Sequence, residues 1–129
     1  TYNENVVISQ GITLRGPNAG IHGTGIRTAE ASVVGYVAIN STAAVTVDGI
    51  EFRTNTTLTG SPDGVNSVLS LSAGSGHAIR NSIFFSTVNG GSASPQLRAV
   101  MLTTGVAGAV TIQNNLLTGA SIGKYSTAA

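Results

Sequence analysis

The chain has five side chains with which an acid–base reaction or a calcium-dependent elimination could be carried out. These carboxylates are Glu4, Glu30, Asp48, Glu51 and Asp63. Hydrolysis of a glycosidic bond uses two carboxylates that face each other across the bond, and a calcium site uses several around one cation. Asp48 and Glu51 lie on either side of a sharp bend expected at Gly49, and Asp63 lies in a stretch rich in Gly and Ser. The spacing therefore indicates no catalytic pair.

The two histidines are the other candidates for acid–base or metal chemistry. His22 lies in a Gly-rich stretch without a second histidine, a cysteine or a carboxylate at metal-ligand spacing. His77 occupies a position that is Val45 and Val110 in the neighbouring repeats described below. We interpret it as a core histidine held by hydrogen bonds rather than as a ligand or a general base. We predict no catalytic residue, no metal site and no cofactor, and we expect the protein not to be an enzyme.

A short phrase recurs along the chain at a nearly constant distance. It reads GITLRG at 11–16, AVTVDGIEF at 44–52, HAIRNSIFF at 77–85 and AVTIQNNLL at 109–117. The apolar markers Leu14, Val47, Ile79 and Ile112 are separated by steps of 33, 32 and 33 residues. A second column, Ile8, Ile39, Leu71 and Leu102, has steps of 31, 32 and 31 residues. Two columns with one shared period predict stacked coils, in which equivalent residues lie above one another.

Each coil is predicted to contain short strands, because β-branched residues and strict alternation dominate these segments. The expected strands are 5–9 and 11–15 in the first coil, 36–40, 45–48 and 50–53 in the second, 68–72, 77–80 and 83–86 in the third, and 99–103, 110–113 and 116–118 in the fourth. The stretches 17–32, 54–66 and 87–96 are rich in residues that favour turns. We expect them to be loops that follow the third strand of a coil and leave the solenoid at one corner.

Alternation along each strand predicts which side chains face the core. The inward columns expected on the first and second strands are Val6/Val37/Leu69/Val100, Ile8/Ile39/Leu71/Leu102, Ile12/Val45/His77/Val110 and Leu14/Val47/Ile79/Ile112. On the third strand they are Ile50/Ile83/Leu116 and Phe52/Phe85/Thr118. The corner before the third strand is expected at Gly16, Gly49, Asn81 and Asn114, residue types that tolerate a left-handed backbone.

Two outward faces are candidate contact surfaces. The first-strand face consists of Val7, Ala38, Ser70 and Met101, and it continues into further uncharged residues. On the third strand, Phe84 and Leu117 are predicted to point outward, either under the long loops or toward another chain. The outward column Arg15/Asp48/Arg80/Gln113 alternates in charge and is expected to form an exposed ion ladder, which contributes about 0–1 kcal/mol per pair.

The opening stretch from Thr1 to Ile21, TYNENVVISQGITLRGPNAGI, has Tyr2, Glu4 and Val6 leading into Ile-Thr-Leu-x-Gly. It resembles the first coil of right-handed parallel β-helix proteins of the pectin-lyase-like superfamily. The phrases VTVDGIEF, HAIRNSIFF and VTIQNNLL resemble its inner coils. The resemblance implies an all-β fold: one parallel β-helix domain over residues 1–129, with about four coils and three short strands per coil. That superfamily includes pectate lyases, pectinesterases, tailspikes and adhesins, so the fold does not decide the function.

Composition limits the partners and the compartment. The chain is 41% hydrophobic but only 9% charged, with a formal net charge of +1 and no cysteine. Few charges together with many Thr, Ser, Asn and Gly residues are typical of extracellular β-rich proteins, so we expect the protein to be secreted or to lie at the cell surface. The absence of cysteine leaves the redox compartment undecided. Scattered basic residues argue against nucleic-acid binding. No apolar run approaches the ~20 residues of a membrane span, so we expect no membrane insertion.

We therefore expect a structural or adhesive module, with copies of itself as partners. No polar cap is visible at either end of the solenoid, which predicts end-to-end stacking into a filament, lateral contact, or membership of a longer surface protein. The alternative is a carbohydrate-active or carbohydrate-binding β-helix, which turnover of polygalacturonate would reveal. Ice binding by the threonine rank Thr13/Thr46/Ala78/Thr111 is disfavoured by the charged column beside it, and thermal hysteresis would test it.

Overall fold

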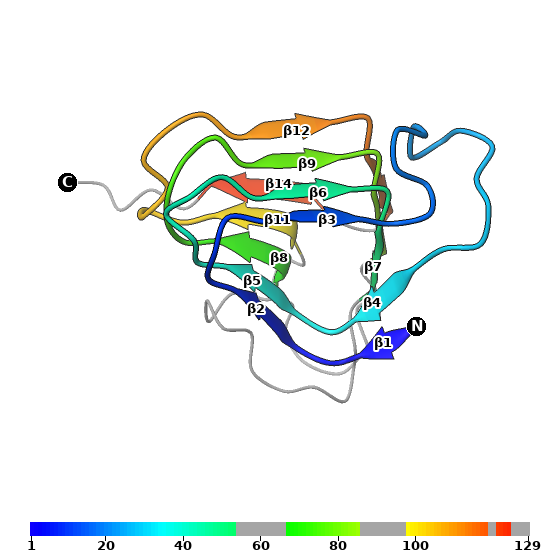
Figure 1. Cartoon of the computed structure of the whole chain (residues 1–129), viewed down its shortest axis with the longest axis horizontal. Helices are drawn as coiled ribbons and strands as arrows, with labels where there is room; N and C mark the ends of the chain where they lie inside the picture. The colour runs from blue at the N-terminus through cyan, green and yellow to red at the C-terminus, as the bar shows by residue number, and fades with distance from the viewer. Residues whose placement is uncertain (54–66, 86–97, 119–120, 125–129) are drawn as a thin grey trace.

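The computed structural model describes residues 1–53, 67–85, 98–118 and 121–124. Within these ranges the protein is built from short parallel strands that form three sheets (Figure 1). Sheet A contains β1 (Tyr2–Asn3), β4 (Ser32–Val34), β7 (Glu51–Arg53), β10 (Ile83–Phe85) and β13 (Leu116–Thr118). Sheet B contains β2 (Val6–Ile8), β5 (Val37–Ile39), β8 (Ser67–Leu71), β11 (Arg98–Leu102) and β14 (Ser121–Lys124). Sheet C contains β3 (Thr13–Arg15), β6 (Thr46–Asp48), β9 (Ala78–Arg80) and β12 (Thr111–Gln113).

The chain visits the three sheets in turn, so that each strand pairs with the strand one coil later. Consecutive strands belong to sheets A, B and C in repeating order, and all the strand pairs are parallel. Figure 1 shows β3, β6, β9 and β12 stacked along one side and β2, β5 and β8 stacked along another. This arrangement is a parallel β-helix of about four coils, as the sequence predicts.

The register predicted for sheets B and C is confirmed. Val37 pairs with Val6 and Leu69, and Leu69 pairs with Val100. The Leu14 column is paired in the same way through Val47, Ile79 and Ile112 in sheet C. The period of the repeat is therefore the coil length of the helix.

In sheet A the predicted pairing of Ile83 with Leu116 and of Phe85 with Thr118 is confirmed, but the predicted alignment of the second coil with the third is wrong by one residue. Phe52 pairs with Phe84 rather than with Phe85, and their rings stack with centroids 5.1 Å apart. The reason is that two corner residues separate sheets C and A in the second, third and fourth coils. Ile50, the second of these residues, belongs to the corner and therefore aligns with Ser82 rather than with Ile83. The inward column of sheet A is consequently Tyr2, Val33, Phe52, Phe84 and Leu117.

The first loop leaves the helix at a different corner from the one predicted. Residues 17–31, hereafter the corner segment, connect β3 of sheet C to β4 of sheet A, because β4 takes the sheet A position of its coil. The sequence-based expectation placed this loop after a third strand. The predicted loops 54–66 and 87–96 lie outside the described residues. Sheet A also begins earlier than expected, at β1.

The corner between sheets C and A needs special backbone conformations, as predicted for three of its four residues. Gly49 has φ of 74°, Asn81 of 52° and Asn114 of 58°. Gly16 does not share this conformation, and it is required for a different reason. A Cβ atom at Gly16 would lie 2.1 Å from the carbonyl oxygen of Gly49, so only glycine lets the two coils approach.

The core lies inside the triangular coil and is most complete in the middle coils. Ile39, Val47, Phe52, Leu71 and Ile79 are fully buried. Apolar residues of the first and last coils are only partly buried against this core: Val6, Leu14, Ala31, Leu102, Val106, Val110, Ile112 and Leu117. The described residues include no helix long and apolar enough to cross a membrane.

Candidate functional site: the open ends of the solenoid

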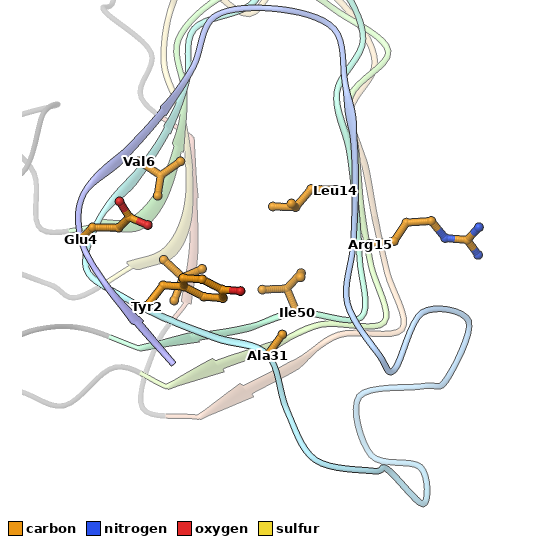
Figure 2. A pocket seen from close by; sticks show the side chains of 8 residues that line it. Tyr2, Glu4, Val6, Leu14, Arg15, Ala31 and Ile50 are labelled. Atoms are coloured by element: carbon orange, nitrogen blue, oxygen red, sulfur yellow. The ribbon is translucent and has the colours of Figure 1, made fainter.

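The first coil surrounds an apolar hollow of about 310 Å³ at the end of the solenoid. We call it the end hollow, and its lining residues are Tyr2, Glu4, Val6, Leu14, Arg15, Ala31, Val33 and Ile50. Figure 2 shows that Leu14 and Ile50 point into the space enclosed by the coil and that the ring of Tyr2 extends across it. The guanidinium of Arg15 points away from the hollow.

The end hollow exists because the first coil has a neighbour on one side only. β1, β2 and β3 are the outermost strands of their sheets, so no described strand pairs with their outer edges. The inward side chains of these strands would be covered by a further coil. Tyr2 is 60% exposed instead, and Val6 and Leu14 are half-buried. The hollow is therefore a cross-section of the core that is open to water.

The opposite end of the solenoid has the same character. Val110, Ile112 and Leu117 belong to inward columns that are closed in the middle coils, yet all three are half-buried here. Among the described residues, both ends thus present apolar side chains beside strand edges that pair with no further strand. Chemically, such surfaces suit another layer of β-strand, because a strand supplies both apolar contacts and backbone hydrogen bonds.

Among the carboxylates considered from the sequence, Glu51 is committed to structural contacts. Its side chain is buried, with Oε1 accepting hydrogen bonds from Ser32 Oγ (2.6 Å) and Arg53 Nε (2.5 Å), while Oε2 accepts from an Arg53 guanidinium nitrogen (3.1 Å). Burial by itself would raise the pKa of Glu51. The hydrogen bonds from Arg53 and Ser32, with the charges of Arg53 and Arg27, outweigh burial and lower the pKa below its ordinary value of 4.5.

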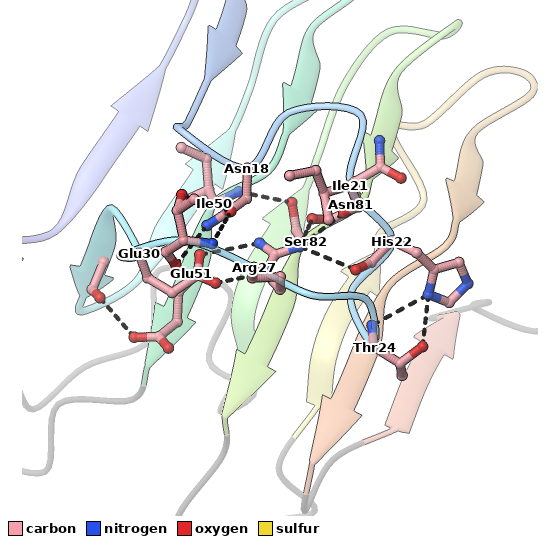
Figure 3. Close-up of polar contacts among 12 residues, drawn as sticks. Asn18, Ile21, His22, Thr24, Arg27, Glu30, Ile50, Glu51, Asn81 and Ser82 are labelled. Carbon is pink, nitrogen blue, oxygen red and sulfur yellow. Dashed lines mark hydrogen bonds and ion pairs between the residues drawn. The ribbon is translucent and has the colours of Figure 1, made fainter.

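Glu30 is bound by a nearly buried arginine of the same corner segment. Arg27 donates to both carboxylate oxygens of Glu30, at 2.5 and 3.0 Å, in a bidentate pair. Figure 3 shows the Arg27 guanidinium between Glu30 and the backbone of the third coil. It also donates to the carbonyl oxygens of Ile21 (2.9 Å) and Asn81 (2.8 Å). Glu30 and Arg27 therefore attach the corner segment to the solenoid.

Asp48 does not take part in the ion ladder expected from the sequence. It is aligned between Arg15 and Arg80, as predicted. Its Oδ1 atom, however, accepts hydrogen bonds from the backbone N–H of Gly20 (2.9 Å) and from Asn81 Nδ2 (2.7 Å). The ion pairs found in the described residues are Arg27–Glu30 and Arg53–Glu51. Glu4 lies on the rim of the end hollow, and Asp63 lies outside the described residues.

His77 is the hydrogen-bonded core histidine that the sequence predicts. It is fully buried, and its Nδ1 accepts a hydrogen bond from the backbone N–H of Val45 (3.1 Å). The ring is therefore the tautomer protonated at Nε2, which donates to the carbonyl oxygen of Ala73 (2.8 Å). His22 is exposed and contacts Thr24 through Nδ1. Among the described residues, no group of three His, Cys, Asp or Glu side chains could hold a metal ion.

The predicted contact faces have a different burial from that expected. Val7 is exposed at 64%, but Ala38 and Ser70 are buried within the single chain, and the side chain of Met101 lies outside the described part. The outward placement of Phe84 and Leu117 is wrong. Phe84 is fully buried and stacks on Phe52, and Leu117 packs against the core, because the register of sheet A differs by one residue. Of this set, Val7 is the side chain left exposed.

Sequence patterns did not reveal the contacts of the corner segment. Buried Asn18 joins the two ends of this segment: its Oδ1 accepts from the backbone N–H (2.8 Å) and the hydroxyl (3.0 Å) of Thr28. Gly23 donates its N–H to the carbonyl oxygen of Asn114 in the fourth coil (2.8 Å). Most of these partners are backbone groups, which every residue has, so no residue pattern marks them. The feature of the sequence that points to these contacts is the cluster of Asn, Arg and Glu in an otherwise Gly-rich stretch.

Comparison of the chain with protein-family models, with curated proteins and with solved structures gave no match.

Proposed function

We propose that this protein is a structural or adhesive β-solenoid module that associates end to end through its two open coils. The observation that carries the proposal is the end hollow, an apolar core cross-section of about 310 Å³ that faces water. Leaving such a surface wet costs about 25 cal/mol per Å² of apolar area, so covering it is favourable. A second copy, or further coils of a longer solenoid, would cover it.

The two end surfaces are chemically complementary. One presents Tyr2 and Leu14, and the other presents Leu117 and Ile112, which occupy the same two inward columns. Stacking the last coil of one copy on the first coil of the next would therefore continue apolar columns without placing a charge in the core. Because the contact joins two different surfaces, it repeats in one direction and generates an open filament.

The proposed setting is extracellular, in a secreted or surface protein of the pectin-lyase-like superfamily. The support is compositional and local: 9% charged residues, many Thr, Ser, Asn and Gly residues, and the phrase from Tyr2 through Val6 into Ile12–Leu14. The module acts as a scaffold or an adhesive element in this proposal, and Glu30, Asp48 and Glu51 act as structural groups rather than as catalytic ones.

Two variants of β1 test the end-to-end contact. Tyr2→Lys places a cation over the end hollow, whereas Asn3→Lys adds the same charge to the adjacent exposed residue that does not line it. Both side chains are exposed, so neither change should unfold the coil. Sedimentation velocity and electron microscopy at rising protein concentration would measure assembly.

We expect the parent chain and Asn3→Lys to form elongated assemblies and Tyr2→Lys to remain monomeric. A parent chain that stays monomeric at high concentration would contradict self-association. Equal assembly of Tyr2→Lys and the parent chain would show that the contact is made elsewhere, with the exposed side chain of Val7 as the next position to test.

A further inference from the structure

Asn40 lies at the corner where the second coil passes from sheet B to sheet C. It directly follows β5, which ends at Ile39, and its side chain is exposed. Within the described part of the chain, the side-chain amide of Asn40 has no hydrogen-bond partner. The amide nitrogens of Asn18 and Asn81, by contrast, donate hydrogen bonds inside the protein. The amide nitrogen of Asn40 is therefore accessible from the solvent.

The backbone on either side of Asn40 is held in place. Its N–H donates to the carbonyl oxygen of Ile8 in the first coil (2.9 Å). The next residue, Ser41, is buried, and its hydroxyl donates to the carbonyl oxygen of Ala43 (2.9 Å). Thr42 is exposed. The turn thus keeps its middle side chain inside and leaves the side chains of Asn40 and Thr42 in the solvent.

The neighbours of Asn40 in the stack leave room for a bulky group. Asn40 lies between Ser9 of the first coil and Ser72 of the third, because each of the three directly follows a paired position of β2, β5 or β8. Both serines are exposed, small and uncharged. A large polar substituent on the amide of Asn40 would therefore meet neither a bulky side chain nor a charge in the adjacent coils.

The sequence at this turn has the pattern of an N-glycan acceptor. The residues Asn40, Ser41 and Thr42 match Asn-X-Ser/Thr, in which X is not proline. A second match, Asn55-Thr56-Thr57, lies outside the described residues. Three residues are a short pattern in a chain rich in Thr. Exposure, an unbonded amide and small neighbours are independent observations, and they all point to Asn40.

We propose that Asn40 is an N-glycosylation site. The amide nitrogen of Asn40 forms a bond to the anomeric carbon of an oligosaccharide carried on a lipid diphosphate. The bond between that carbon and the phosphate oxygen breaks, and the lipid diphosphate leaves with the electron pair. A base of the transferase takes the amide proton. The lipid-linked donor and the transferase belong to the secretory pathway, so this proposal rests on the extracellular setting proposed above.

A glycan at this position would leave the end-to-end contact free. Asn40 does not line the end hollow. It lies on the outer side of sheet B, as does Val7, whose side chain is 64% exposed. A bulky, solubilising glycan there would oppose lateral contact through this side of the solenoid. The modified protein would therefore associate through its ends rather than through its sides.

The test is to send the chain 1–129 through the secretory pathway of a eukaryotic cell line behind a cleavable signal peptide. Every chain carries Asn55→Gln, so that Asn40 is the acceptor under study. Thr42→Val removes the hydroxyl of the acceptor pattern with little change in shape, whereas Thr42→Ser keeps it. Intact mass and peptide mass spectrometry, before and after an amidase that releases N-linked glycans and leaves aspartate, locate the glycan. Both secreted and retained material is measured.

We expect a glycan on Asn40 in the chain with Thr42 and in Thr42→Ser, and its complete loss in Thr42→Val. Both variants change an exposed side chain, so all three chains should fold. An unmodified Asn40 in the chain with Thr42, in secreted and retained material alike, would overturn the proposal. A glycan retained in Thr42→Val would overturn it as well. Glycan attachment is read from mass and end-to-end contact from sedimentation, so failure of one proposal is distinguishable from failure of the other.

Discussion

The guanidinium of Arg27 donates a hydrogen bond to the carbonyl oxygen of Asn81 (2.8 Å), although 54 residues separate the two in the chain. The same side chain holds Glu30, and Gly23 of the same segment bonds to Asn114 in the fourth coil. Residues 17–31 therefore extend along the corner between sheets C and A and link coils that are distant in sequence (Figure 3). This long-range connection acts in addition to the ladders that join each coil to the next.

Replacement of Arg27 by alanine should destabilise the solenoid by about 3 kcal/mol, because it leaves the Glu30 carboxylate without its cation in a largely buried site. Urea denaturation would measure the loss. The matched control is Arg15→Ala, since Arg15 is exposed and points away from the end hollow, and it should change stability by less than about 0.5 kcal/mol. The double variant Arg27→Ala/Glu30→Ala should recover part of the loss. Equal effects of the two single variants would contradict a clamping role for Arg27.

The register of sheet A predicts opposite consequences for two adjacent phenylalanines. Phe84 is fully buried on Phe52, so Phe84→Ala should cost about 3–5 kcal/mol through lost burial and a cavity. Phe85 is only half-buried and lies under the guanidinium of Arg53, 4.7 Å from Cζ to the ring centroid. Phe85→Ala should therefore cost about 1 kcal/mol. Thermal or urea unfolding measures the stability of both variants. A larger loss of stability for Phe85→Ala than for Phe84→Ala would support the register expected from the sequence.

Glu51 should make the stability of the protein depend on pH. Its pKa is lowered in the folded state, so its ionised form stabilises the fold at pH values above the ordinary value of 4.5. This contribution is lost as the pH falls below 4.5 through the lowered folded pKa. Glu51→Gln should therefore be less stable than the parent chain at pH 7, and the difference should shrink toward pH 3. Urea midpoints measured across this range test the prediction, and a difference that is constant with pH would contradict it.

The two histidines should respond differently to the same substitution. His77→Phe keeps a ring in the core but leaves the N–H of Val45 and the carbonyl of Ala73 without their partner, so we expect a loss of about 2–4 kcal/mol. His22→Phe, at an exposed position, should change stability by less than about 0.5 kcal/mol. Unfolding in urea at pH 7 measures both. A His77→Phe variant as stable as the parent chain would indicate that water replaces the hydrogen bonds of the ring nitrogens.

The repeat and the alternation of apolar residues predict the solenoid, its coil length and the inward columns of sheets B and C. These features can be predicted from short stretches of sequence. Alternation of apolar and polar residues indicates which side of a strand is buried, and the repeat aligns one coil with the next. The buried role of His77 followed from its column in the same way. The left-handed corner at Gly49, Asn81 and Asn114 followed from residue type.

The alignment of the second coil with the third in sheet A does not follow from the sequence pattern. The second corner position is occupied by Ile50, Ser82 and Asn115 in successive coils. Ile50 is apolar whereas the other two are polar, so an alignment by hydrophobic type shifts the following strand by one residue. The structure resolves the ambiguity through bonds that cross coils: Ser82 Oγ accepts from the N–H of Ile50 (3.3 Å), and Asn115 Oδ1 accepts from the N–H of Ser82 (2.8 Å). The stacking of Phe84 on Phe52 is a consequence of that register.

The path of the corner segment and the strand count of the sheets also required the tertiary structure. Arg27 and Gly23 bond to backbone carbonyls, and a backbone carbonyl has no signature in the sequence because every residue contributes one. Likewise, the sequence predicted no strand at Tyr2–Asn3 or at Ser32–Val34, and the structure places both in sheet A. That choice depends on how the chain closes each coil in space, which residue type and spacing do not specify.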